Sequence, residues 1–226
     1  MTIILTNDDG IDAPGIRALS EVINHQGMFV APQEELSGCG HKVTTRSPIP
    51  VERRSDTEYA VGGTPADCIR LAITHLSPQI DWVLSGINSG GNLGVDVYIS
   101  GTVAAVREAA FHGIRGIALS QYRKGGRPVN WEQTKRWSER VLKELFNRPL
   151  EPGSFWNVNF PYLEPDEPEP EMVFCKPSTK PLPVDYKIDG ENYLYIGNYS
   201  LRERSRETDV DVCFSGKIAV TQIKLE

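Results

Sequence analysis

The feature that most constrains the fold is an alternation of short apolar runs with helix-patterned segments over roughly the first 120 residues. Runs without polar alternation are typical of strands buried on both faces. Four such runs are residues 2–6 (TIILT), 28–31, 81–85 (DWVLS) and 116–120 (GIALS). Helical spacing or helix-start signals lie between them, at residues 14–27, 64–76 and 102–112. Strands that alternate with helices predict an α/β fold with a doubly wound, mostly parallel sheet and helices on both faces.

The chain changes character after about residue 125. Residues 131–146 have the spacing of an amphipathic helix, and residues 156–160 (WNVNF) suit one more strand of the sheet. A segment rich in proline and acidic residues follows, and then alternating stretches, NYLYI and KIAVTQI, that suggest hairpins. We therefore expect an α/β core at residues 1–160, and a linker with a C-terminal extension that returns to the core at residues 161–226.

Composition excludes several classes of protein. The net charge is −6, which argues against a nucleic-acid polymer as partner. No apolar run approaches the ~20 residues of a membrane helix, and no basic leader precedes the first strand, so we expect a cytoplasmic protein without a membrane partner. The four cysteines lie far apart without a CxxC pair, and we expect them to be reduced.

Two adjacent carboxylates, Asp8 and Asp9, follow the first predicted strand in the motif NDDG. An Asp-Gly turn is one explanation. The other is a metal site, because ligands of open α/β sheets bind at the carboxyl ends of the strands. Two carboxylates ~4 Å apart repel by ~4 kcal/mol at an effective dielectric near 20, and a hard cation such as Mg²⁺ or Mn²⁺ removes that penalty. The motif alone leaves both explanations open.

A second polar segment, SGINSGGNLGVDVYISGTVAAVREAAFHG at residues 85–113, follows another buried strand. Its glycines permit close approach of a ligand, and Asn88 and Asn92 offer amide groups. Ser100, Gly101 and Thr102 stand at a helix start, where free N–H groups attract a phosphate. Ser100 could also be a plain helix cap. The segment matches neither a Walker P-loop nor a dinucleotide fingerprint.

A third segment, LSGCGH at residues 36–41, follows the second strand. Ser37 could offer a hydroxyl to a metal, and His41 could act as an acid or base or be structural. No GxSxG elbow surrounds Ser37, so a serine-nucleophile hydrolase is not expected.

Together, TNDDGIDAPGIRAL, APQEELSGCGHKVT, VGGTPADCIRLA and SGINSGGNLGVDVYISGTVAAVREA resemble the SurE family, stationary-phase survival proteins that are metal-dependent 5′/3′-nucleotidases. The resemblance continues through WNVNFP and TDVDVCFSGKIAVTQI. It implies a Rossmann-like core, with residues 1–160 as the catalytic part. It also implies a C-terminal β-hairpin or arm that is exchanged between subunits in a homodimer or homotetramer.

By this resemblance, the metal ligands are Asp8, Asp9, Ser37 and Asn88, with one Mg²⁺ or Mn²⁺ per subunit. Asp8 and Asp9 are also the catalytic residues. The phosphate pocket is lined by Asn92, Ser100, Gly101 and Thr102. The implied activity is that of a 5′-nucleotidase or acid phosphatase-type phosphoric monoester hydrolase, in which a metal-activated water releases phosphate from nucleoside 5′- and 3′-monophosphates. Leu36 and Gln33 depart from the arginine and the acidic residue usual in the family, which bears on substrate preference.

Two alternatives remain at the level of the sequence. One is a nucleotide-binding sensor without catalysis, which would be marked by loss of a metal ligand; none of the four is missing. The other is a scaffold that presents the acidic loop at residues 164–171, which would leave the polar glycine-rich loops unexplained.

Overall fold

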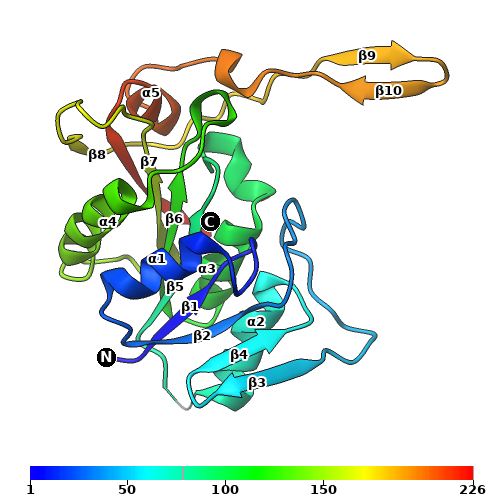
Figure 1. The fold of residues 1–226 in the computed structure, drawn as a ribbon, viewed down its shortest axis with the longest axis vertical. Helices are drawn as coiled ribbons and strands as arrows, with labels where there is room; N and C mark the ends of the chain where they lie inside the picture. Colours follow the sequence, from blue (N-terminus) through cyan, green and yellow to red (C-terminus); the bar gives the residue numbers. More distant parts are fainter. Residues whose placement is uncertain (78, 226) are drawn as a thin grey trace.

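A computed structural model describes residues 1–77 and 79–225 (Figure 1). Within these residues, nine strands form one sheet in the order β3-β4-β2-β1-β5-β6-β7-β11-β8. The strands of this sheet are β1 (Ile3–Thr6), β2 (Gly27–Pro32), β3 (Val51–Ser55), β4 (Glu58–Val61), β5 (Trp82–Asn88), β6 (Arg115–Gln121), β7 (Ser154–Phe160), β8 (Met172–Phe174) and β11 (Ile218–Lys224). From β4 through β7 every neighbouring pair is parallel, which confirms the predicted α/β class.

Helices cover both faces of the sheet, as predicted. The helices are α1 (Pro14–Val22), α2 (Pro65–Leu71), α3 (Gly101–Phe111), α4 (Trp131–Leu145) and α5 (Asp209–Phe214). Leu5 packs in one core with side chains of α1 and α4, whereas its neighbour Ile4 packs in a second core with α2 and α3. Successive side chains of a strand point to opposite faces, so an all-apolar β1 feeds both cores.

The start of α2 follows the signal in the sequence. The Asp67 backbone N–H donates to Thr64 Oγ1 at 3.2 Å, and the Thr64 N–H donates to Asp67 Oδ2 at 3.0 Å. These two bonds form the reciprocal capping box that Thr64-Pro65-Ala66-Asp67 predicts.

One prediction for the C-terminal segment is wrong. KIAVTQI does not form a hairpin of its own; β11 lies inside the main sheet, antiparallel to β7 and parallel to β8. The reason is burial: Ile218, Ala219, Val220 and Thr221 are all buried, which only an interior strand permits. The sequence reading also missed the β3–β4 hairpin and α5. All five residues of β3 are exposed, so no apolar pattern marks it.

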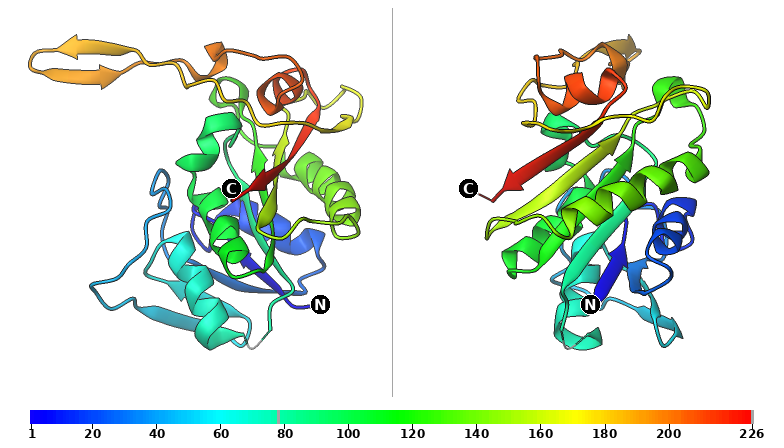
Figure 2. Two further views of the ribbon diagram at one scale, coloured as in Figure 1. Left: turned by 180° about the vertical axis from the view of Figure 1, so that it is seen from behind. Right: turned by 90° about the vertical axis from the view of Figure 1, so that its left-hand side faces the viewer.

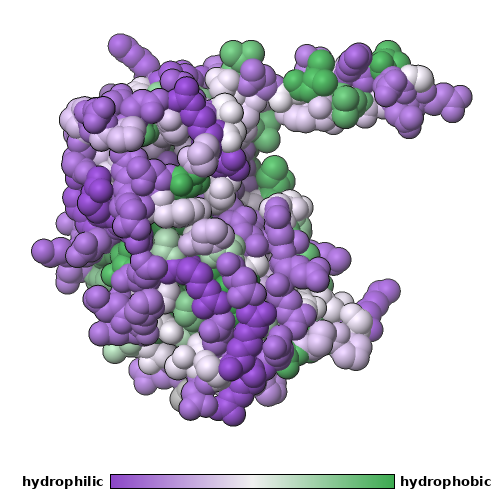
Figure 3. All heavy atoms as spheres, viewed as in Figure 1, coloured by the Kyte–Doolittle hydropathy of each residue, from purple (hydrophilic) through white to green (hydrophobic). Residues whose placement is uncertain are grey.

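The NYLYI stretch does form the predicted hairpin. β9 (Tyr186–Asp189) and β10 (Asn192–Tyr195) pair only with each other among the described residues and extend clear of the body (Figure 2). The register places Tyr186 opposite Tyr195 and Ile188 opposite Tyr193 on one face, and all four are exposed. Apolar side chains gather along this arm in the space-filling view (Figure 3).

No helix among the described residues has the length and apolar character needed to cross a lipid bilayer.

Gly15 sets the approach of α1 to the sheet, and we predict that Gly15→Ala lowers the free energy of unfolding by about 1–3 kcal/mol. An added Cβ would lie 1.9 Å from the Ile87 carbonyl oxygen and 3.1 Å from the Trp131 ring, so the helix must shift. Urea denaturation measures the change. Glu21→Ala, on the exposed side of the same helix, is the control and should leave the midpoint near that of the wild type.

Candidate metal and phosphate site

Six of the eight predicted site residues line one pocket of about 530 Å³ at the carboxyl edge of the sheet. They are Asp8, Asp9, Ser37, Asn88, Asn92 and Ser100. β1 and β5 pair in parallel, so the residues that follow each strand emerge at the same edge. The other two, Gly101 and Thr102, are buried against Asp8.

The NDDG motif forms a tight turn, and Asn7 closes it. Asn7 Nδ2 donates to the Gly10 carbonyl at 2.7 Å, and Gly10 has a φ of +100°. The Leu36 N–H donates to the Asp8 carbonyl at 2.8 Å, which ties this turn to the loop that carries Ser37. The turn therefore leaves both carboxylates free for the pocket, so the two explanations of NDDG are compatible.

Asp8 is only 5% exposed, and the first turn of α3 contacts its side chain. Thr102 Oγ1 donates to Asp8 Oδ1 at 2.5 Å. Burial raises the pKa of Asp8 to about 6, a shift that the hydrogen bond from Thr102 opposes and the charge of Asp9 increases. A Cβ at Gly101 would lie 2.8 Å from Asp8 Cβ, so only glycine fits there.

Asp9 is more accessible than Asp8 and faces a second acidic residue. Burial raises the pKa of Asp9, the Ser89 N–H donates to its Oδ2 at 3.2 Å and opposes this rise, and the negative charge of Glu35 adds to it. Ser37 Oγ donates to Glu35 Oε1 at 2.7 Å. Glu35 lines the pocket, but the sequence reading missed it because an acidic residue in a polar loop has no local signal.

The two asparagines differ in how far they are committed to other bonds. Asn88 Nδ2 donates to the Gly90 carbonyl at 2.9 Å. This bond uses the amide nitrogen and leaves the Asn88 Oδ1 atom as the acceptor for a ligand. Asn92 Nδ2 donates to Ser120 Oγ at 2.8 Å, and the Asn92 N–H donates to Asn159 Oδ1 at 2.7 Å. Asn92 thus fixes the glycine-rich loop to β6 and β7 as well as lining the pocket.

Ser100 caps α3 and also lines the pocket. Its Oγ accepts from the Val103 N–H at 3.1 Å. α3 spans eleven residues. The free N–H groups at its N-terminus and its dipole favour an anion in the part of the pocket near Asp8 and Asp9.

The donor set suits a hard divalent cation. Asp8, Asp9, Ser37 and Asn88 supply carboxylate, hydroxyl and amide oxygens, the ligands that Mg²⁺ and Mn²⁺ prefer. Neither Asp8 nor Asp9 forms an ion pair with Lys or Arg in the described part of the chain. In residues 1–77 and 79–225, no three His, Cys, Asp or Glu side chains form a metal-binding group. A cation here would therefore depend on neutral oxygens beside the two aspartates.

His41 lies outside this pocket and binds α3 instead. Arg107 Nη1 donates to His41 Nδ1 at 3.3 Å, which leaves Nε2 as the donor to Glu108 Oε2 at 2.8 Å. The imidazole also stacks on Phe111. These contacts support the structural explanation of His41 and anchor the loop that carries Ser37.

The C-terminal segment supplies part of the pocket wall, which the sequence reading missed. Tyr199 and Leu182 line the pocket. Tyr199 Oη donates to Asp96 Oδ2 at 2.5 Å, and Arg202, only 4% exposed, pairs with the same oxygen at 2.8 Å. Arg202 Nη2 also donates to the Leu93 carbonyl. The base of the arm is thereby locked to the glycine-rich loop.

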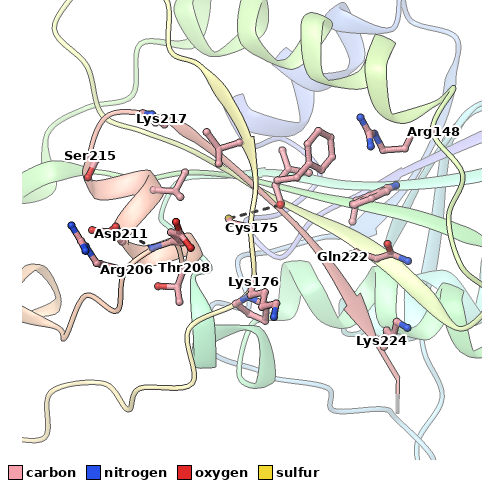
Figure 4. A pocket seen from close by; sticks show the side chains of 17 residues that line it. Arg148, Cys175, Lys176, Arg206, Thr208, Asp211, Ser215, Lys217, Gln222 and Lys224 are labelled. Atoms are coloured by element: carbon pink, nitrogen blue, oxygen red, sulfur yellow. Dashed lines mark hydrogen bonds between the residues drawn. The ribbon is translucent and has the colours of Figure 1, made fainter.

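A larger cleft, of about 1010 Å³, lies beside the edge strand β8 and α5 (Figure 4). None of the predicted site residues lines it. Four of its charged side chains have ion-pair partners: Lys217 pairs with Glu171 at 2.7 Å, Asp211 with Arg204 at 3.2 Å, Arg148 with Glu144 at 2.7 Å and Lys224 with Glu151 at 2.5 Å. Chemistry, rather than size, therefore assigns the candidate site to the smaller pocket.

Glu108 should make the stability of the protein depend on pH. Burial alone would raise its pKa, but hydrogen bonds with His41 and Arg70 lower the pKa below the usual 4.5. A lowered folded-state pKa gives stability that is present above the unfolded pKa and is lost as the pH falls through the folded pKa. Because its side chain is 1% exposed, we predict that Glu108→Gln costs about 1–3 kcal/mol at pH 7 and less below pH 4.5.

Urea denaturation of the wild type and Glu108→Gln between pH 3.5 and pH 7 measures this difference. Glu139→Gln, at an exposed carboxylate of α4, is the matched control. Parallel loss of stability in the wild type and Glu108→Gln as the pH falls would contradict the prediction.

Comparison with known proteins identifies the family. The family model "Survival protein SurE" matches residues 3–181. A protein of Nostoc sp., whose name proposes a 5′-nucleotidase, is 62% identical over the full length of both chains. A protein of Methylobacterium sp. (strain 4-46) named 5′-nucleotidase SurE is 36% identical over all of this chain and 94% of its own length.

The fold agrees with this match. The crystal structure of SurE protein from Aquifex aeolicus superposes with a TM-score of 0.87 at 31% identity, covering all of this chain and 94% of that one. The family model spans most of the chain, and the relatives match over nearly their full length. This chain therefore belongs to the SurE family.

Proposed function

We propose that the protein is a metal-dependent phosphoric monoester hydrolase that releases phosphate from nucleoside 5′- and 3′-monophosphates. The curated relatives are named for 5′-nucleotidase activity, which supports the nucleotide as substrate class. The observation that carries the proposal is the buried Asp8 carboxylate, which lies beside Asp9 in the pocket and against the N-terminus of α3.

In this proposal, one Mg²⁺ or Mn²⁺ would be held by Asp8, Asp9, Ser37 and Asn88, and when bound it would supply positive charge for the phosphate and a lowered pKa for a nearby water. Thr102 orients the Asp8 carboxylate through its hydrogen bond and favours its ionised form.

The phosphate is held by the chain's own groups at the start of α3. The backbone N–H groups after Ser100 donate to phosphate oxygens and offset the charge that develops on them. Asp9, the more accessible carboxylate, accepts a hydrogen bond from the attacking water and sets its direction. Gly101 lets α3 approach Asp8 closely. The N–H groups of α3 and the Asp8 carboxylate can therefore act at the same phosphate.

We also propose that the chain assembles as a homodimer or homotetramer through the β9–β10 arm. An isolated two-stranded ribbon is at best marginally stable in water. One face of this ribbon presents Tyr186, Ile188, Tyr193 and Tyr195 to solvent, and a patch of this kind is typical of an interaction surface.

Phosphate release is the first test of the proposed activity. We predict release from 5′-AMP and 3′-AMP with Mn²⁺ or Mg²⁺ and none with EDTA, and a fall in kcat of more than about a hundredfold in Asp8→Asn. Asp12→Asn is the matched control, because Asp12 is an exposed carboxylate that pairs with Arg54 outside the pocket.

The contradicting result would be activity that survives in Asp8→Asn or in EDTA. Mn²⁺ binding by calorimetry gives a second readout. Mn²⁺ and nucleotide binding by the wild type without phosphate release from any substrate would favour the nucleotide-binding sensor.

Assembly through the arm can be tested by placing charged residues on its apolar face. We predict that the double variant Ile188→Lys with Tyr193→Lys shifts the mass measured by light scattering to that of a smaller species, because both side chains lie on the apolar face. Lys187→Ala is the control. Lys187 lies opposite Leu194 in the strand register, so its side chain is on the other face of the ribbon. A monomeric wild type, or a double variant with unchanged mass, would contradict the proposed assembly.

A further inference from the structure

Arg123 is the one cationic side chain among the described residues that line the candidate pocket. The other charged groups of the lining are four carboxylates, those of Asp8, Asp9, Glu35 and Asp96. A pocket this acidic repels a nucleotide unless cations offset its field. A divalent ion held by Asp8 and Asp9 would offset the charge of one phosphate. Arg123 is not among the groups that bind that phosphate or orient the attacking water.

Arg123 emerges at the same sheet edge as the metal ligands, but farther along it. β1, β5 and β6 are consecutive strands that pair in parallel. Asp8 follows β1, Asn88 ends β5, and Arg123 follows β6 by two residues. With a strand spacing of ~4.8 Å, the backbone of Arg123 is displaced from that of Asp8 by roughly 10 Å across the sheet. Arg123 is therefore suited to a different part of the substrate than the phosphate beside Asp8.

The guanidinium is held in place without losing its charge. Arg123 Nε donates to the Arg127 carbonyl at 2.9 Å, and Nη2 donates to the Gly126 carbonyl at 2.5 Å. Both partners are neutral backbone groups, and Arg123 forms no ion pair with a carboxylate in the described part of the chain. These bonds leave the Nη1 group for a ligand, and a fixed guanidinium fork suits a phosphate.

The nearby carboxylate of Asp96 does not form an ion pair with Arg123. Asp96 already pairs with the buried Arg202 and accepts from Tyr199. Tyr199 and Leu182 give the lining an apolar surface as well, which fits the uncharged middle of a nucleotide. The pocket thus combines an oxygen-rich end, an apolar wall and a separate cation.

We propose that Arg123 binds a second phosphoryl group, so that nucleotides with a phosphate on each side of the ribose are substrates alongside the monophosphates. This inference rests on the proposed function and names its substrate class. The second phosphate is on the other side of the ribose, as in adenosine 3′,5′-bisphosphate, where it is a separate dianionic monoester. In ADP the inner phosphoryl group is bonded to the terminal one through an anhydride oxygen and carries a single charge, so it would lie beside the phosphate at Asp8 and not at Arg123.

The test compares kcat/KM for adenosine 3′,5′-bisphosphate and 5′-AMP with Mn²⁺ in the wild type, Arg123→Gln and Arg123→Lys. We expect the wild type to release phosphate from both nucleotides. In Arg123→Gln, the ratio of kcat/KM for adenosine 3′,5′-bisphosphate to that for 5′-AMP should fall about tenfold or more through KM. Arg123→Lys should retain part of the ratio, because it keeps the charge but loses the fork.

Arg127→Gln is the matched control. Arg127 is in the same loop, but its side chain bonds Tyr162 and Glu164 and does not line the pocket. Its substrate ratios should equal those of the wild type. A wild type that releases phosphate from 5′-AMP but none from adenosine 3′,5′-bisphosphate, or an Arg123→Gln ratio equal to that of Arg127→Gln, would overturn the proposal.

Failure of the proposed function would be recognised separately, as no phosphate release from any nucleotide by the wild type. Calorimetric affinity for adenosine 3′,5′-bisphosphate and 5′-AMP then decides the role of Arg123. Selective loss of affinity for adenosine 3′,5′-bisphosphate in Arg123→Gln would support the proposal, and equal affinities in the two proteins would overturn it.

Discussion

The site depends on one costly constraint, a carboxylate that is almost withdrawn from water. Asp8 is 5% exposed, and burial raises its pKa to about 6. A neighbouring Asp9 adds repulsion, and hydrogen bonds from the Thr102 hydroxyl and from the backbone of Asp8 and Thr102 only partly offset the rise in pKa. Two neighbouring carboxylates with this little solvent repel each other, so rigid elements must hold them together. Carboxylates with raised pKa values are typical of functional sites.

The rigidity comes from the parallel sheet and from α3. Pairing of β1 with β5 fixes the turn of Asp8 relative to Asn88, and the absence of a Cβ at Gly101 lets the start of α3 contact Asp8. The loop with Ser37 is fastened at both ends, by the Leu36 N–H bond to Asp8 and by the contact of His41 with Glu108. Three segments distant in sequence are thereby brought to one pocket.

Local signals in the sequence predict the parts of the site that sit at ends of regular elements. Asp8 and Asp9 follow an apolar strand, and Ser100 precedes a helical run, so position and chemistry can be read together. Glu35, Arg123 and Tyr199 have no such signal, because only tertiary packing brings them to the pocket. β11 was misassigned for the same reason: its partner β7 is about 60 residues away, and sequence alternation does not reveal a distant strand pair.

Anomalous diffraction from crystals soaked in Mn²⁺ tests the central claim most directly. The account predicts a single strong manganese peak in each subunit, within bonding distance of carboxylate oxygens of both Asp8 and Asp9, with Ser37 and Asn88 around it. The peak should disappear in Asp8→Asn crystals treated identically. A peak elsewhere in crystals of active protein, with none between the two aspartates, would contradict the account.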